Sequence, residues 1–134
     1  MFLNQLEDVN KELFLKVCIH AAWSNGVFVN EEKEMIFAYC REMSIPEDVP
    51  EYDGTINDVL SELAEKATTK EKNIIVLEIL GLVKADGVYE DKEKEFMDAL
   101  VTGMKVKEGV LSKLNSLLDI YATVCKELFF TLSE

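Results

Sequence analysis

The chain of 134 residues has few residues that interrupt helices, with only two prolines and six glycines. Leu, Glu, Lys and Ala, which favour helix, are abundant, and no stretch shows the polar–apolar alternation of a half-buried strand. A chain of this length usually forms one domain with a substantial hydrophobic core. We therefore predict a single all-α domain over residues 1–134, a compact bundle of about seven to eight helices.

Positive charge is also scarce, because 14 Lys and Arg stand against 26 Asp and Glu and give a formal net charge of −12. Such a surface repels phosphate backbones and anionic lipid headgroups, so we expect neither nucleic acid nor a membrane surface as a partner. The longest apolar tract, residues 74–83, contains Glu78 and is shorter than the ~20 residues that span a bilayer. Residues 1–10 lack the features of a signal peptide, and we expect a cytoplasmic protein without direct membrane insertion.

Groups that carry chemistry are few. The one histidine, His20, lies on the apolar face of a predicted helix, where a partly buried and hydrogen-bonded side chain is expected. Cys18, Cys40 and Cys125 are widely spaced without a CxxC pair, which favours buried free thiols over a zinc site or disulfides. No P-loop, HExxH, GxSxG or dinucleotide fingerprint is present. The sequence therefore predicts no catalytic residues and no enzyme.

Apolar periodicity predicts helices over about residues 4–24, 30–43, 55–66, 70–85 and 91–104, and again from about residue 107. A helical turn at Pro46 and a break at Asn115–Ser116 are further expectations. The segment 74–83 is apolar on almost every side and should form the central buried helix, with Gly81 admitting a close neighbour. Trp23 is expected in the core. The apolar C-terminal residues fit either the core or a dimer contact, which leaves a homodimer open; they are Leu128, Phe129, Phe130 and Leu132.

The chain also contains an internal repeat. A shift of 61 residues places residues 14–49 on residues 75–110, and nine of these 36 positions are then identical, where chance gives about two or three. We predict two helical units related by a pseudo-twofold axis, repeat 1 over about residues 14–67 and repeat 2 over about 75–118. The alternative is that any two helical hairpins look alike.

Acidic residues gather at the turn of each unit. The second copy has Asp86, Glu90, Asp91 and Glu93 around Gly87, and the first copy keeps Glu32 beside the turn Asn25-Gly26. Carboxylates at a turn can bind a divalent cation, although the spacing is not that of an EF-hand. The alternative is structural, with Asp86 bonded to turn amides, Asp91 as an N-cap and Glu93 opposite the helix dipole.

The repeated motif resembles the TerB-like (tellurite-resistance protein B) domains and the related N-terminal domain of DjlA-type co-chaperones. Ser24-Asn25-Gly26-Val27 with Glu32, and Ala85-Asp86-Gly87-Val88 with Glu93, carry the resemblance. It implies a compact all-α bundle with a role in stress response or tellurite resistance, without established catalysis. It also implies metal-binding acidic residues at Asp86, Glu93 and Glu32, although Asn25 stands where the family usually has Asp.

These observations favour a non-enzymatic TerB-like module that acts as a protein-interaction or cation-binding scaffold. A protein partner is expected. A divalent cation is the one cofactor that the acidic residues suggest. The alternative function is an acidic inhibitor or immunity-type protein that covers the basic face of a partner, because a net charge of −12 would steer such an encounter.

Overall fold

A computed structural model describes residues 1–23, 30–49, 56–85 and 89–134, and every regular element within these ranges is helical. The predicted all-α class is therefore confirmed. The described residues form one 3₁₀ helix and six α-helices, so the α-helices are fewer than predicted. The elements are η1 (Leu3–Gln5), α1 (Asp8–Ala22), α2 (Asn30–Glu42), α3 (Ile56–Lys66), α4 (Thr69–Val83), α5 (Asp91–Gly103) and α6 (Val110–Ser133).

Two predicted details of the helices are wrong. Residues 46–49 form no helical turn, because Ser44 has a left-handed backbone, with φ of 58°, which does not suit an N-cap, and Glu47 pairs with Arg41 instead. Helix α6 continues unbroken through Asn115 and Ser116. A single Asn or Ser in a helix interior costs less than about 0.7 kcal/mol, which neighbouring apolar contacts outweigh.

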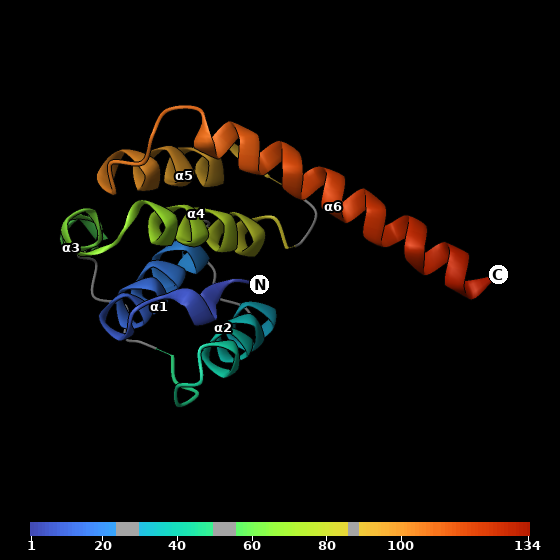
Figure 1. Cartoon of the computed structure of the whole chain (residues 1–134), viewed down its shortest axis with the longest axis horizontal. Coiled ribbons are helices and arrows are strands. Elements are labelled where there is room, and N and C mark those ends of the chain that lie inside the picture. The colour runs from blue at the N-terminus through green and yellow to red at the C-terminus, as the bar shows by residue number, and fades with distance from the viewer. Residues whose placement is uncertain (24–29, 50–55, 86–88) are drawn as a thin grey trace.

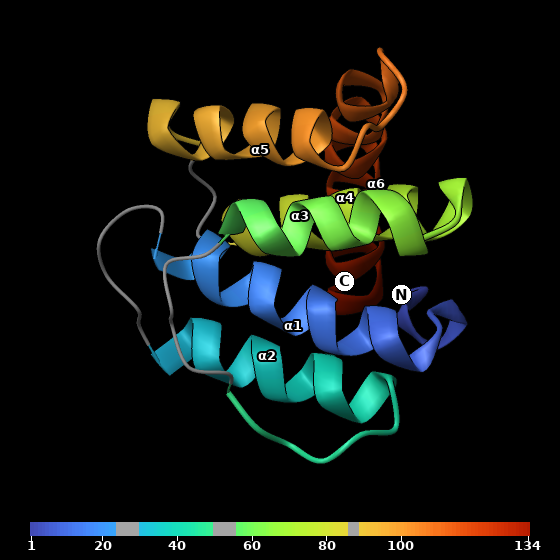
Figure 2. The same ribbon diagram turned by 90° about the vertical axis from the view of Figure 1, so that its left-hand side faces the viewer.

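Helix α4 lies at the centre of the fold, as its apolar sequence predicts. It contacts α1, α5 and α6, and α1 also contacts α2 and α3. Figure 2 shows α5, the α3 and α4 pair, α1 and α2 in successive layers, with α6 crossing behind them. The core comes from the inner faces of all these layers, and its fully buried large side chains include Phe14, Ile36, Leu63, Ile75, Ile79, Met97 and Met104.

Other packing expectations are corrected. Trp23 is 39% exposed and lies outside the core. Apart from the adjoining backbone of α4 and the two chain neighbours, no described atom lies within 4 Å of the position that a Cβ would take at Gly81. The close approach occurs at Gly103 instead, where a Cβ would meet Leu60 Cδ1 at 2.6 Å. The contact between α3 and α5 therefore depends on the last residue of α5.

The described helices follow the offset of the sequence repeat. A shift of 61 residues carries the bounds of α1 onto those of α4 and the bounds of α2 onto those of α5. Ser44 and Lys105, also 61 apart, both have left-handed backbones, with φ of 58° and 59°. In each case the next residue's N–H donates to the carbonyl five residues earlier, Ile45 to Cys40 and Val106 to Val101, as in a Schellman motif. The pseudo-twofold axis itself stays a prediction.

A buried carboxylate joins the first turns of α1 and α4. Glu71 Oε1 accepts the Thr68 N–H, and the Glu71 N–H donates to the Thr68 hydroxyl, which closes a capping box. Glu71 Oε2 accepts the Glu7 N–H and the Asn10 side-chain amide, both at 2.9 Å. Burial disfavours the charged form of Glu71, but these hydrogen bonds outweigh burial and lower its pKa. The carboxylate is therefore ionised at neutral pH and stabilises both helix starts.

Candidate functional site

Among the residues that the structure describes, helix α6 is attached to the rest of the fold only near its start. Leu111, Leu114 and Leu118 are half-buried against the core, and Gly109, with φ of 90°, precedes the first turn. Lys84, just after α4, donates to Asn115 Oδ1 at 2.6 Å and to Asp119 Oδ1 at 2.5 Å. We call the part of the fold formed by η1 and α1 to α5 the body. These contacts fix the direction of α6 as it leaves the body.

The remainder of α6 projects away from the body (Figure 1). Every residue from Asp119 to Glu134 is exposed, although nine of these 16 residues are apolar. No residue of α6 is buried. The expectation that the apolar C-terminal residues pack in the core is therefore wrong, and a dimer contact stays a prediction. Cys125 is also exposed, whereas Cys18 and Cys40 are buried as predicted.

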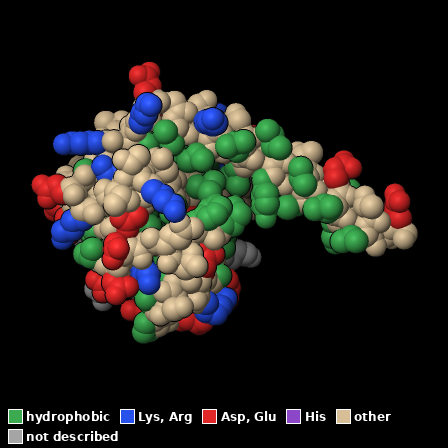
Figure 3. Space-filling view, in the orientation of Figure 1, with side chains coloured by type: hydrophobic (Ala, Val, Ile, Leu, Met, Phe, Trp, Pro, Cys, Tyr) green, Lys and Arg blue, Asp and Glu red, His purple; other side chains and the backbone are tan. Residues whose placement is uncertain are grey.

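The exposed apolar side chains of α6 share one face. We call this face the α6 stripe; its spacing of three or four residues is that of an amphipathic helix. Figure 3 shows hydrophobic side chains gathered in the angle between α6 and the body and continuing along the helix. The stripe consists of Leu117, Ile120, Tyr121, Val124, Leu128 and Leu132, which are 49% to 85% exposed.

A hollow of about 510 Å³ lies where the projecting part of α6 leaves α4. Gly81 belongs to its wall, which explains why no side chain meets that glycine. Tyr121 joins the hollow to the stripe. The lining residues are Gly81, Lys84, Leu118, Asp119, Tyr121, Ala122, Cys125 and Lys126. Sequence reasoning missed the role of Lys84, because nothing in the local pattern relates it to a helix 31 residues away.

The acidic turn of the second copy is only partly described. Asp86 and Gly87, like Asn25 and Gly26 of the first copy, lie outside the described residues. Glu90 and Asp91 are exposed, whereas Glu93 is 6% exposed. Glu93 Oε1 accepts the Glu90 N–H at 3.0 Å, so it takes the N3 position of a capping arrangement. Asp91 is the first residue of α5 rather than its N-cap, which is Glu90.

Two lysines contact Tyr89. The ammonium groups of Lys84 and Lys94 each lie 5.6 Å from the centre of the Tyr89 ring. Burial raises the pKa of the Tyr89 hydroxyl, so the ring stays neutral at physiological pH. Within the described ranges, no three side chains of His, Cys, Asp or Glu come together as a metal site. Glu32 in α2 is half-buried and belongs to no such group.

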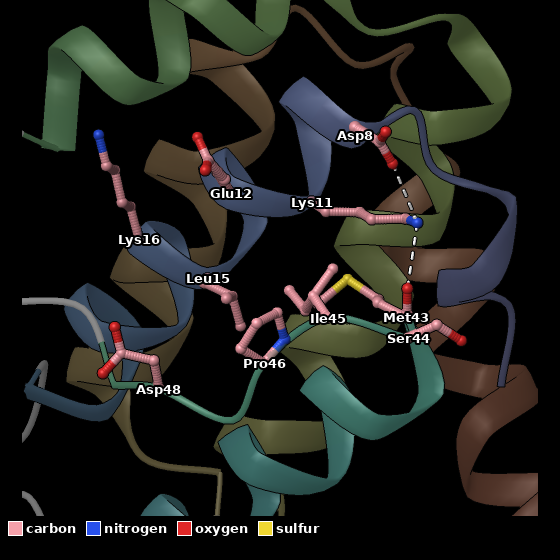
Figure 4. A pocket seen from close by; sticks show the side chains of 10 residues that line it. All are labelled: Asp8, Lys11, Glu12, Leu15, Lys16, Met43, Ser44, Ile45, Pro46 and Asp48. Atoms are coloured by element: carbon pink, nitrogen blue, oxygen red, sulfur yellow. Dashed lines mark hydrogen bonds and ion pairs between the residues drawn. The ribbon is translucent and has the colours of Figure 1, made fainter.

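A second hollow, of about 650 Å³, lies between α1 and the segment that follows α2. Lys11 crosses it, bonded to Met43 O at 3.1 Å and to Asp8 at 3.2 Å (Figure 4). Leu15 faces the apolar side chains of the segment, whereas Glu12 and Lys16 lie at the rim. The Lys11 ammonium, which is the enclosed charge, is thus already paired with protein atoms. Its bond to Met43 O attaches the segment to α1. The lining residues are Asp8, Lys11, Glu12, Leu15, Lys16, Met43, Ser44, Ile45, Pro46 and Asp48.

The buried groups suited to chemistry are kept away from solvent. His20 is 7% exposed, as predicted, and Cys18 is fully buried. Burial raises the pKa of the Cys18 thiol well above its ordinary value, which disfavours the thiolate that a nucleophile needs. None of the described helices is long and apolar enough to cross a membrane.

The overall fold is shared with a known protein. No family model matches the sequence, and no curated protein matches it significantly. The crystal structure of a tellurite resistance protein from Nostoc punctiforme is similar over 95% of this chain and 82% of its own, with a TM-score of 0.72 and 20% sequence identity. The chain therefore has the fold of a tellurite resistance protein, and the TerB-like fold indicated by its repeated motif is confirmed.

Proposed function

We propose that this protein is a non-enzymatic interaction module in a stress or tellurite-resistance-type response, and that the α6 stripe is its binding surface. One observation carries the proposal: the projecting part of α6 has a continuous apolar face whose residues are all exposed. An exposed apolar patch of this size usually marks a protein interface. The similarity to a tellurite resistance protein supports the type of response.

The α6 stripe is suited to binding because it is already ordered. Lys84 and the half-buried leucines fix the base of α6, so the projecting turns present their side chains without a further folding step. Binding to a preformed helix avoids the entropy of ordering a flexible segment. The helix-in-groove and helix-pair modes both use anchors at such spacing.

The test is photo-crosslinking in the native host. A benzoylphenylalanine residue replaces Val124 on the stripe or, as the matched control, Thr123, which is also exposed but points about 100° away around the helix. We expect protein adducts from position 124 and few from position 123. If position 124 forms no protein adduct, the α6 stripe is not a protein-binding surface and the proposal fails.

The same experiment separates the alternative of an acidic inhibitor. A basic partner would bind the charged body, because α6 carries no net charge, with Lys113 and Lys126 against Asp119 and Glu127. That partner would leave position 124 without adducts.

The sequence alone also supports the proposal that the acidic turn around Gly87 binds a divalent cation. Its test is the thermal stability of metal-stripped protein with and without Ca²⁺, Mg²⁺, Mn²⁺ or Zn²⁺, beside an Asp86→Ala/Glu93→Ala variant. An ion at 100 times its dissociation constant stabilises a protein by about 2.7 kcal/mol. A shift that the variant loses would locate the ion at this turn. Because Glu93 already accepts a capping bond from the Glu90 N–H, we expect no shift.

A further inference from the structure

We propose that the occupant of the α6 stripe is the α6 stripe of a second copy of this chain, packed antiparallel. This inference rests on the proposed function, since it identifies the partner of the same surface. Three features of the described residues carry it: the size of the stripe, the distribution of charge, and the place at which α6 joins the body.

The size of the stripe matches what a dimer needs. Its six large apolar residues are 49% to 85% exposed, and their open area is of the same order as the ~800 Å² that each partner buries in a standard interface. Parts of the neighbouring Phe129 and Cys125 add to this area. A twofold dimer uses the same patch on both copies, so one self-complementary apolar face is sufficient.

The charge distribution favours a second copy over other partners. The chain has a net charge of −12, yet residues 110–133 contain two Lys, one Asp and one Glu and are neutral overall. A basic partner would be attracted to the acidic body, and an anionic membrane would be repelled by it. The neutral helix is the element through which two acidic molecules can approach with least repulsion.

The attachment of α6 determines the direction of packing. The body lies at the N-terminal end of the helix, and the C-terminal end is free (Figure 1). Parallel packing would bring two acidic bodies side by side. Antiparallel packing places them at opposite ends of a helix pair about 36 Å long. The stripe then pairs about a midpoint close to Val124, and each Leu132 lies near the base of the other helix.

Sedimentation velocity over a range of concentrations gives the first test. We expect the wild type to have twice the monomer mass of 15.2 kDa. Val124→Glu would place two carboxylates at the centre of the interface and should raise the dissociation constant at least about 100-fold. Thr123→Glu adds the same charge at the neighbouring position on the other face and should leave it within about threefold. Because Val124 has no buried contact to lose, circular dichroism should show both variants folded.

Disulfide crosslinking tests the direction of packing. In a Cys125→Ser background, Val124→Cys should form a disulfide-linked dimer under mild oxidation, whereas Leu132→Cys should not. Efficient dimers from both positions would overturn the antiparallel arrangement. A wild type that is monomeric at every concentration would overturn the dimer itself. If photo-crosslinks from position 124 then reach only other proteins, the interaction module stands and the second copy is excluded as its partner.

Discussion

Replacement of Glu71 by Gln should destabilise the protein at neutral pH, because one carboxylate accepts hydrogen bonds at the first turns of two helices. Its two oxygens take the Thr68, Glu7 and Asn10 donors at 2.9 to 3.0 Å. Gln keeps one acceptor oxygen but has an NH₂ group in place of the second, and this group would face N–H donors that it cannot bond. A hydrogen bond to a charged group contributes about 1.5–3 kcal/mol, so a loss of about 2–4 kcal/mol in the free energy of unfolding is expected.

The pH dependence of this loss follows from the lowered pKa of Glu71 in the folded state. A carboxyl with a lowered folded pKa stabilises the protein fully above its unfolded pKa of about 4.3, and the contribution disappears as pH falls through the folded pKa. The difference between wild type and Glu71→Gln should therefore be largest near pH 7 and shrink below about pH 4.

The assay is urea unfolding followed by circular dichroism at several pH values. Glu65→Gln, which removes an exposed carboxylate from the preceding helix, is the matched control and should change the free energy of unfolding by less than about 0.5 kcal/mol. A Glu71→Gln loss no larger than that of the control at pH 7 would refute the reasoning. So would a loss that keeps its size in acid, because it would then not depend on the charge.

Three further predictions concern other elements. In thermal melts Gly103→Ala should destabilise the protein by about 1–3 kcal/mol, since its Cβ would lie 2.6 Å from Leu60 Cδ1. Gly81→Ala, whose Cβ would meet no described atom of another helix within 4 Å, should stabilise it by up to about 1 kcal/mol, and equal effects of the two changes would contradict the packing. Lys105→Gly should raise the free energy of urea unfolding by up to about 1 kcal/mol by relieving a left-handed backbone, and a loss would show that the lysine side chain matters. Lys84→Met should speed amide hydrogen exchange at the base of α6 several-fold, and unchanged exchange would mean that its two hydrogen bonds do not hold the helix.

The central helix could be predicted from the sequence because its burial depends on its own residue types. Residues apolar on all sides of α4 have one stable location, the interior, and the structure places them there. The place of Glu93 at a helix N-terminus was predicted from its neighbours in the sequence, although the N-cap is Glu90 and not Asp91. Asp86 and Gly87 lie outside the described residues, so the cation site stays a prediction.

The exposed part of α6 could not be predicted, because an apolar stripe has the same spacing whether it faces the chain's own core or another molecule. What separates the two cases is where the supporting core ends, and that depends on residues such as Lys84 that lie far away in the sequence. The glycines show the same limit: Gly81 and Gly103 differ only in what packs opposite them. Trp23 is exposed although its residue type favours the interior.

Lys84 and Tyr89 flank the Asp86-Gly87 turn in the sequence, and Lys84 also bonds to the base of α6. Beyond Asp119 the helix extends for about 21 Å. If it moves as a rigid body, a tilt of about 10° at its base would move its C-terminal end by about 4 Å. A displacement of that size exceeds the tolerance of a packed apolar interface. A shift of the Lys84 ammonium would therefore be amplified at the far end of the helix, where it would disturb the packing of the proposed antiparallel pair.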